Sequence, residues 1–202
     1  MSRPDPDVAI VDGSGANIAS LRFALERLGA RSEVTADRAK IARASHVILP
    51  GVGAARTAMD RLRALGFDAV LPNVQQPLLG ICLGMQLLFE HSEEDNCDCL
   101  GIVPGLVRRF QPAPGHPVPH MGWNQVERLT DSRLLAGVPD RSHFYFTHSF
   151  AAAVSDSTVG QATYGWPFAA VMESGNFMAT QFHPERSGAA GAAVLRNFLG
   201  CD

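Results

Sequence analysis

Lysine is almost absent from this chain of 202 residues, in which 16 of the 17 basic residues are arginine. The 20 acidic residues bring the formal net charge to −3, and the arginines are scattered along the sequence rather than clustered. A surface that binds nucleic acid or an anionic membrane needs a concentrated basic patch. The sequence therefore predicts a protein that contacts neither nucleic acid nor a membrane.

Long apolar runs are also missing. The most apolar stretch, residues 77–89, is interrupted by glycine and glutamine and falls short of the about 20 residues that span a bilayer. The first seven residues contain no apolar core of a secretion signal. We therefore expect a cytoplasmic protein.

Cysteine is scarce and irregularly spaced. The four residues Cys82, Cys97, Cys99 and Cys201 are too few for a disulfide framework in a chain of this length, which favours a reducing compartment. Cys97 and Cys99 follow an acidic stretch and have no second Cys/His pair at zinc-ligand spacing. We interpret this segment as a surface loop without a metal.

Short apolar runs alternate with segments of helical period in the first half of the chain. Strands are predicted at residues 8–11, 46–49 and 77–81, and helices at about 18–28, 57–65 and 83–91. This alternation is typical of a parallel sheet covered by helices.

The second half has the period of strands. Strands are predicted at residues 106–110, 124–129, 143–150, 158–164, 168–173 and 177–182, and a closing helix at 188–199. A proline-rich connection, residues 111–119, divides the halves, yet neither half alone closes a convincing core. We therefore predict one domain over residues 1–202, of the α/β class, with a central mixed, mainly parallel sheet flanked by helices and a β-rich second half.

The segment Gly80-Ile81-Cys82-Leu83-Gly84 lies where a predicted buried strand passes into a helix. In such a turn the central side chain projects from the carboxyl edge of the sheet. The start of a helix also favours a thiolate, which makes a cysteine there more nucleophilic. A cysteine at a strand end is usually a small core residue, but the spacing of the glycines favours Cys82 as a nucleophile.

A thiolate that attacks a carbonyl needs a proton carrier, and seven histidines are present. His183 is followed at i+2 by Glu185, a spacing that in extended chain puts both side chains on one side. The carboxylate can then orient the imidazole, although an isolated pair of this kind is usually a solvated surface pair. His148, in an aromatic strand with no acidic residue near it, is the alternative base.

Acyl transfer also requires hydrogen-bond donors for the developing oxyanion. Pro50-Gly51-Val52-Gly53 follows a predicted strand and can turn backbone N–H groups toward a neighbouring elbow, although an ordinary turn has the same composition. Gly13-Ser14-Gly15 suggests a phosphate loop, but Ile18 stands in place of the third glycine and no Walker lysine follows. We therefore expect no cofactor and no metal.

Two motifs together resemble the class I (triad) glutamine amidotransferase family. They are Gly-Ile-Cys-Leu-Gly-Met-Gln at residues 80–86 and Gln-Phe-His-Pro-Glu at residues 181–185. Further stretches are similar to the glutaminase subunits of imidazole glycerol phosphate synthase; they are residues 49–53, 119–124, 145–149 and 182–187. The resemblance extends over residues 8–199.

The resemblance implies a class I glutamine amidotransferase fold and hydrolysis of glutamine through a γ-glutamyl thioester on Cys82. His183 would act as general base and then acid, and Glu185 would orient its imidazole. The residues that match the family's substrate-binding positions are Gly51, Val52, Gly53, Gln86, Ser149 and Phe150.

A partner is implied as well. In the family, ammonia passes to a cyclase subunit, a (β/α)8 barrel, and the heterodimer makes imidazole glycerol phosphate and aminoimidazole carboxamide ribotide in histidine biosynthesis. Arg186, where the family commonly has lysine, is expected at the partner interface.

Two alternatives remain at this point. A glutaminase subunit of another pathway, such as vitamin B6 or anthranilate synthesis, would share both motifs, and only the stretch around Trp123 separates the two. A non-catalytic regulatory or scaffolding protein could retain the fold, although all three triad positions are intact.

Overall fold

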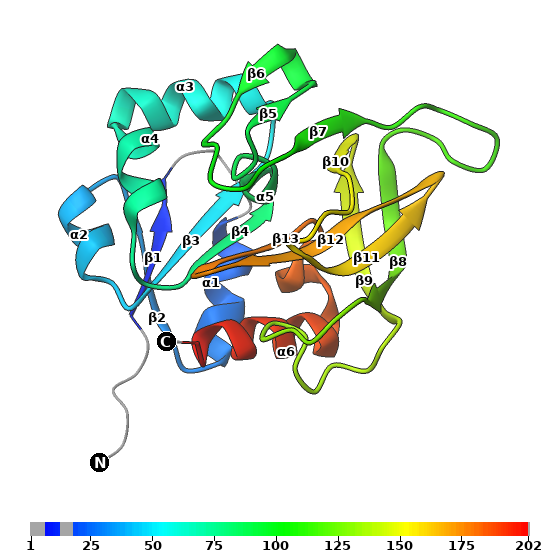
Figure 1. The fold of residues 1–202 in the computed structure, drawn as a ribbon. Coiled ribbons are helices and arrows are strands. Elements are labelled where there is room, and N and C mark those ends of the chain that lie inside the picture. Colours follow the sequence, from blue (N-terminus) through cyan, green and yellow to red (C-terminus); the bar gives the residue numbers. More distant parts are fainter. Residues whose placement is uncertain (1–6, 13–17, 202) are drawn as a thin grey trace.

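A central mixed sheet organises the computed structural model, which describes residues 7–12 and 18–201; the Gly13-Ser14-Gly15 stretch lies outside them. Its parallel strands are β1 (Asp7–Val11), β2 (Arg31–Thr35), β3 (His46–Gly51), β4 (Leu78–Cys82) and β13 (Phe177–Thr180). Its antiparallel strands are β8 (His120–Arg128), β9 (Ser142–His148), β11 (Thr158–Tyr164) and β12 (Trp166–Ser174). The order of these nine strands is β2-β1-β3-β4-β13-β12-β11-β8-β9 (Figure 1).

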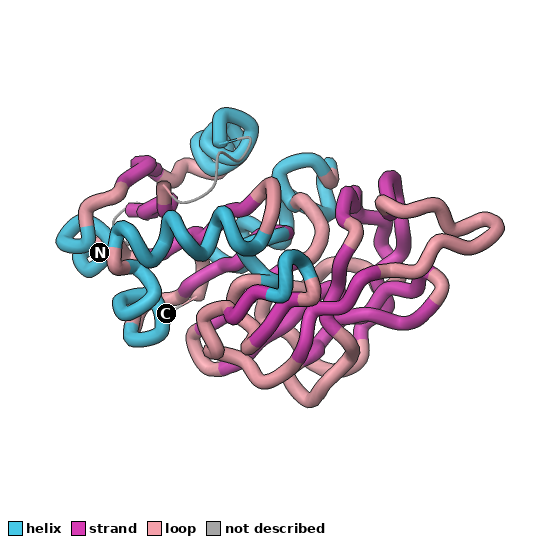
Figure 2. The backbone as a smooth tube through the Cα atoms, turned by 90° about the horizontal axis from the view of Figure 1, so that it is seen from above, coloured by secondary structure: helices cyan, strands magenta, loops and turns pink. Residues whose placement is uncertain are grey.

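Helices cover both faces of this sheet. One face carries α1 (Ile18–Arg27) and α6 (Gly188–Leu199), and the other carries α2 (Arg38–Arg43), α3 (Ala55–Leu65) and α4 (Phe67–Val70). The helices gather at one end of the molecule, and strands and loops fill the other (Figure 2). The predicted α/β fold with a mixed sheet and a β-rich second half is therefore confirmed. The sheet is partly rather than mainly parallel, because its strands pair in parallel from β2 to β13 and antiparallel from β13 to β9.

A smaller sheet lies beside the first. It is formed by β5 (His91–Ser92), β6 (Cys97–Asp98), β7 (Leu106–Arg109) and β10 (Phe150–Ala152), in the order β10-β7-β5-β6. Short 3₁₀ turns complete the secondary structure at Leu71–Asn73, Glu94–Asn96 and Pro184–Arg186. No helix in the described part of the chain is long and apolar enough to cross a membrane.

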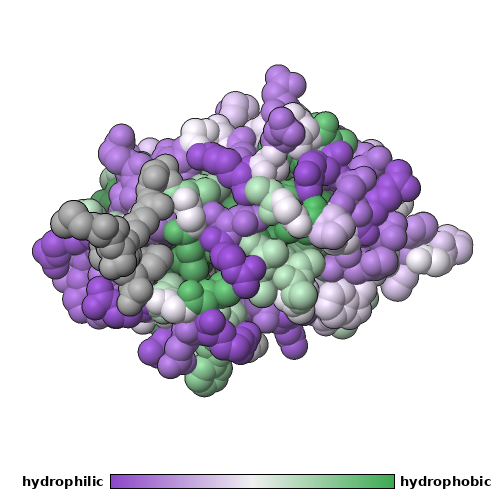
Figure 3. All heavy atoms as spheres, turned by 90° about the horizontal axis from the view of Figure 1, so that it is seen from below, coloured by the Kyte–Doolittle hydropathy of each residue, from purple (hydrophilic) through white to green (hydrophobic). Residues whose placement is uncertain are grey.

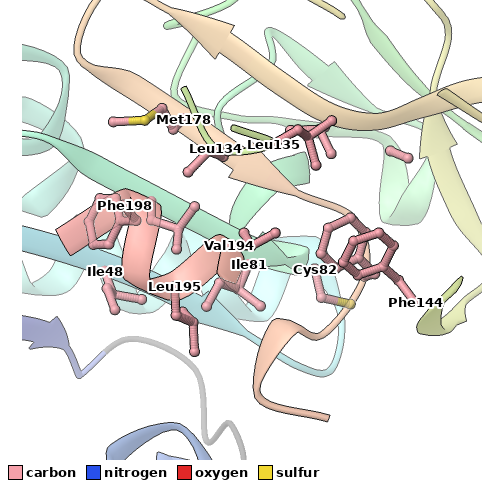
Figure 4. Close-up of a cluster of buried hydrophobic side chains, with 14 of the residues drawn as sticks. Ile48, Ile81, Cys82, Leu134, Leu135, Phe144, Met178, Val194, Leu195 and Phe198 are labelled. Carbon is pink, nitrogen blue, oxygen red and sulfur yellow. The ribbon is translucent and has the colours of Figure 1, made fainter. Parts of the chain in front are cut away.

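Two apolar clusters form the core, one on each side of the central sheet. Cys82 lies at an edge of the cluster under α6, next to Phe144 (Figure 4). On the outer surface seen from below, polar side chains surround apolar ones near the middle of the face (Figure 3).

The structure corrects three local predictions. The helix predicted at residues 83–91 ends at Gln86, as α5 (Leu83–Gln86). Leu87, Leu88 and Phe89 are all buried, so the apolar run has no polar face from which the end of the helix could be located. The strand predicted at 143–150 is divided into β9 and β10. The segment interpreted as a surface loop contains β6, in which Cys97 is only 1% exposed.

Close backbone packing at Gly84 generates a prediction. A Cβ at Gly84 would lie 1.8 Å from the carbonyl oxygen of Leu49, so Gly84→Ala must push α5 away from β3. We expect a loss of unfolding free energy of about 1–3 kcal/mol, as for other overpacked sites, measured by urea denaturation. Gly200→Ala is the control, because its nearest neighbour would lie at 3.4 Å. Equal midpoints for the two variants would contradict the packing argument.

Candidate active site

The side chain of Cys82 projects from a strained turn between β4 and α5. Its backbone has φ 54° and ψ −111°, a conformation that non-glycine residues rarely adopt. Gly80 and Gly84 flank it, and a Cβ at Gly80 would lie 2.8 Å from the Gly84 carbonyl oxygen. The turn therefore has the geometry of a nucleophile elbow, as the glycine spacing indicates.

His183 and Glu185 meet in the structure. The Nδ1 atom of His183 lies 2.9 Å from Oε1 of Glu185, and both side chains are almost fully buried. The contact depends on a 3₁₀ turn at Pro184–Arg186 that follows extended His183, and not on extended chain throughout. Ser187 supports the turn, since its hydroxyl donates to the His183 carbonyl at 2.7 Å and accepts from the Tyr145 N–H at 3.0 Å.

The environment of His183 favours its protonated form. Burial by itself lowers the pKa of the imidazole, but the nearby Cys82 sulfur and the Glu185 carboxylate together raise it from 6.5 to about 10. Its Nε2 atom has no hydrogen-bond partner among the described residues. That nitrogen is therefore free to exchange a proton with a group in the cavity.

Cys82 and His183 line one cavity of about 320 Å³. Five of the predicted substrate-binding residues line it too: Val52, Gly53, Gln86, Ser149 and Phe150. Gly51 does not line it, but pairs with Cys82 across β3 and β4. The structure thus brings together residues that are far apart in the sequence.

Glu94 also lines this cavity, and sequence reasoning missed it because it lies in an acidic stretch that was interpreted as a surface loop. Its Oε2 atom accepts the Ala55 N–H at 2.8 Å, which caps the first turn of α3. Burial raises the pKa of this carboxyl, and the bond from Ala55 opposes that rise. Among the described residues that line this cavity, Glu94 is the one with a carboxylate.

His148 is unsuited to act as the alternative base. Its Nδ1 lies 2.7 Å from the Phe150 carbonyl, which can only accept, so Nδ1 carries the proton. Its Nε2 faces Nδ1 of His120 at 3.0 Å. Burial lowers the pKa of His148 to about 3 and that of His120 to about 4, so both rings are neutral at pH 7 and the lone pair of His148 is occupied.

Arg186 lies on the surface beside the site. Its guanidinium stands 5.2 Å from the ring centroid of Tyr145, and the Tyr145 ring is 6.1 Å from that of Trp123. Trp123 and Met121 are 57% and 65% exposed. Arg186 therefore belongs to an exposed cationic and aromatic surface that begins directly after Glu185.

All four cysteines are free thiols. Burial, and then the neighbouring Cys97, raise the pKa of Cys99 to about 12, so this thiol is unreactive at neutral pH. No group of three or more His, Cys, Asp or Glu side chains in the described residues has the arrangement of a metal site.

Comparison with known proteins agrees with this geometry. The family described as "Glutamine amidotransferase class-I" matches residues 9–200. The chain belongs to the class I glutamine amidotransferases. It is 55% identical, over 96% of both chains, to the "Imidazole glycerol phosphate synthase subunit HisH" of Xanthomonas campestris pv. campestris (strain 8004). The HisH subunit of Xylella fastidiosa (strain Temecula1 / ATCC 700964) is 50% identical over 97% of this chain and 98% of its own.

These relatives place the amidotransferase in the HisH branch rather than among the glutaminase subunits of other pathways. A solved structure titled "Crystal structure of glutamine amidotransferase" shares the fold, with a TM-score of 0.75 and 18% identity over 96% of this chain and 97% of that one. The resemblance expected from the two motifs is therefore confirmed.

The charge of Glu185 generates a prediction for this amidotransferase. Glu185→Gln removes a carboxylate 2.9 Å from His183 and should lower the pKa of the imidazole, now about 10, by about 1–3 pH units. The stability contributed by the pair is complete below pH 6.5 and is lost as the pH rises through about 10. NMR titration of the His183 ring measures the change, and His143, at the far end of β9, is the internal control. An unchanged His183 midpoint would contradict the assigned contact.

Proposed function

We propose that this chain hydrolyses glutamine at Cys82 and supplies the ammonia to a cyclase subunit, a (β/α)8 barrel, for the synthesis of imidazole glycerol phosphate and aminoimidazole carboxamide ribotide in histidine biosynthesis. The observation that carries the proposal is the strained Cys82 elbow, which opens into the same cavity as the imidazole of His183. The similarity of the chain to HisH subunits supports the choice of pathway and partner. We expect the heterodimer to work in the cytoplasm, because Cys82 must stay reduced.

The chemistry follows from the protonation states. With Glu185 holding Nδ1, His183 carries the proton of Cys82 on Nε2 as the thiolate attacks the side-chain carbonyl of glutamine. When the tetrahedral intermediate collapses, this proton passes to the departing nitrogen and ammonia leaves. His183 then takes a proton from water, which attacks the γ-glutamyl thioester and releases glutamate.

Different residues of the cavity would contact different parts of the glutamine substrate. The backbone at Gly51, Val52 and Gly53 would supply an N–H to the oxyanion, because this turn follows the strand that pairs with Cys82. Gln86, Ser149 and Phe150 would hold the amino-acid end of glutamine. We add Glu94 to this set, since its carboxylate suits the α-ammonium group of the substrate.

Cys82→Ala tests the nucleophile. The variant should lose glutamine-dependent synthesis by a factor of about 10⁴ or more, while synthesis from ammonium salts continues, because the cyclase needs only ammonia. Product formation is measured in the complex with each nitrogen source. Cys201→Ala, which removes a partly exposed thiol that does not line the cavity, is the control.

A labelling experiment with the same variant tests the alternative that the chain is a non-catalytic scaffolding protein. A glutamine-analogue diazoketone should label the wild-type chain at Cys82 and leave Cys82→Ala unlabelled. Appreciable glutaminase activity in Cys82→Ala, or no activity in the wild-type complex, would refute the proposed mechanism.

Arg186→Ala tests the partner surface. A cross-interface charge that loses its partner costs about 2–5 kcal/mol when it is buried in the complex, so we expect weaker association with the cyclase, or more glutamate formed per product. The dissociation constant and the ratio of glutamate to product measure the two effects. Arg141→Ala is the control, because it removes another exposed arginine, just before β9, whose ion pair is with Glu127. If both quantities stay at wild-type values, Arg186 is a solvated cation.

A further inference from the structure

Two buried carboxamides, those of Gln86 and Gln181, are linked to the sulfur of Cys82. Gln86 and Gln181 are 4% and 0% exposed. The Nε2 atom of Gln86 donates to the Phe150 carbonyl at 2.8 Å and to Oε1 of Gln181 at 3.0 Å. The Nε2 atom of Gln181 lies 3.8 Å from Sγ of Cys82. These contacts form a continuous chain from a backbone carbonyl to the sulfur.

The carbonyl fixes the direction of this chain. A backbone oxygen can only accept, so Gln86 must turn its NH₂ group toward Phe150. The same NH₂ group meets Gln181, which must therefore present its oxygen. The NH₂ group of Gln181 is therefore the group that faces Cys82.

Neutral histidines hold the carbonyl itself in place. His148 donates to the Phe150 oxygen through Nδ1 at 2.7 Å, and accepts at Nε2 from His120. The two lone pairs of the Phe150 oxygen are thus occupied by His148 and Gln86. Rotation of this peptide would break both bonds in a buried environment, so the orientation of Gln86 and Gln181 is fixed by the surrounding fold.

A second polar group, a backbone carbonyl, also contacts the sulfur of Cys82. Sγ lies 3.8 Å from the carbonyl oxygen of Thr147, which can only accept. A thiol can donate its proton to that oxygen, but a thiolate cannot and is repelled by it. The N–H of Gln181 remains a donor in either case, and hydrogen bonds to charged acceptors are the stronger ones.

We propose that Gln181 is a further catalytic residue, whose amide N–H stabilises the thiolate of Cys82, and that Gln86 and His148 are positioning residues that orient it. This inference rests on the proposed function, because it assumes that Cys82 is the nucleophile. Gln181 does not line the glutamine cavity, which separates its action from substrate binding.

Gln181→Met removes the donor and keeps a side chain of similar length. A hydrogen bond to a charged group is worth a factor of about ten or more, and the long contact to sulfur places this one at the lower end. We expect alkylation of Cys82 by iodoacetamide to be about tenfold slower at pH 7. The pH of half-maximal rate should rise, and the rates should converge at high pH, where the thiolate forms without help.

Alkylation is followed by mass spectrometry of the Cys82 peptide of the full-length chain, so that the other thiols do not interfere. The other titratable side chains that line the cavity with Cys82 are unchanged in this variant: Glu94, His148 and His183, the last with its partner Glu185. In the complex with the cyclase, kcat for glutamine hydrolysis should fall about tenfold and KM should stay within about twofold.

Two further variants make the test decisive. Gln181→Glu keeps the shape and the oxygen that faces Gln86, and because a carboxyl group ionises before a thiol, it should slow alkylation at pH 7 at least as much. Gln76→Met removes a carboxamide that donates to the Ile41 carbonyl at 2.7 Å, remote from the site, and should leave the pH dependence unchanged.

The possible failures are distinguishable. A wild-type pH dependence of alkylation in both Gln181 variants would overturn this inference while leaving Cys82 as the nucleophile. Glutaminase activity that survives Cys82→Ala would instead overturn the proposed function, whatever Gln181 does. If Gln181→Met fails to fold, Gln181→Glu decides the question alone.

Discussion

Direct packing of backbone against backbone, where the turn after β4 meets β3, is the constraint on which the site depends. A Cβ at Gly84 would lie 1.8 Å from the Leu49 oxygen, and one at Gly51 would lie 2.7 Å from the Gly84 nitrogen. The absence of side chains here lets Gly51 pair with Cys82 and brings the following turn to the edge of the cavity. Larger residues would separate the proposed oxyanion donors from the sulfur.

The same packing supports the strain at Cys82. A non-glycine residue at φ 54° costs on the order of 1–3 kcal/mol. It is held because β4 is fully buried and pairs with β3 on one side and β13 on the other. The carboxamides of Gln86 and Gln181 are hydrogen-bonded to each other, and that of Gln181 contacts the sulfur. The side chain is therefore fixed by a fully buried strand that is paired on both sides, which is how a nucleophile can be held ready without substrate.

The parts of the site that residue spacing alone predicts are local, whereas the cavity residues Gln86, Ser149 and Phe150 were expected only from the family resemblance. The elbow and the His183–Glu185 pair each lie within a few residues, so spacing alone indicates them. Glu94 contacts Ala55, 39 residues away, and Gln181 contacts Cys82, 99 residues away. The periodicity of a sequence does not predict such long-range contacts. The same limit explains the misplaced end of α5, because an apolar run that is buried all round has no face to define its period.

The position of β13 explains why the two halves of the chain work together. This strand comes from the second half, yet it pairs in parallel with β4 of the first half and antiparallel with β12. The site therefore lies where the sheet changes direction, with Cys82 at the end of one strand and His183 just beyond the end of its neighbour. Strand β9 then adds Thr147 and His148 from the antiparallel half. Because neither side of the 111–119 connection holds both the thiol and the imidazole, the cavity exists only when the halves share one sheet, which is the physical reason to propose a single domain.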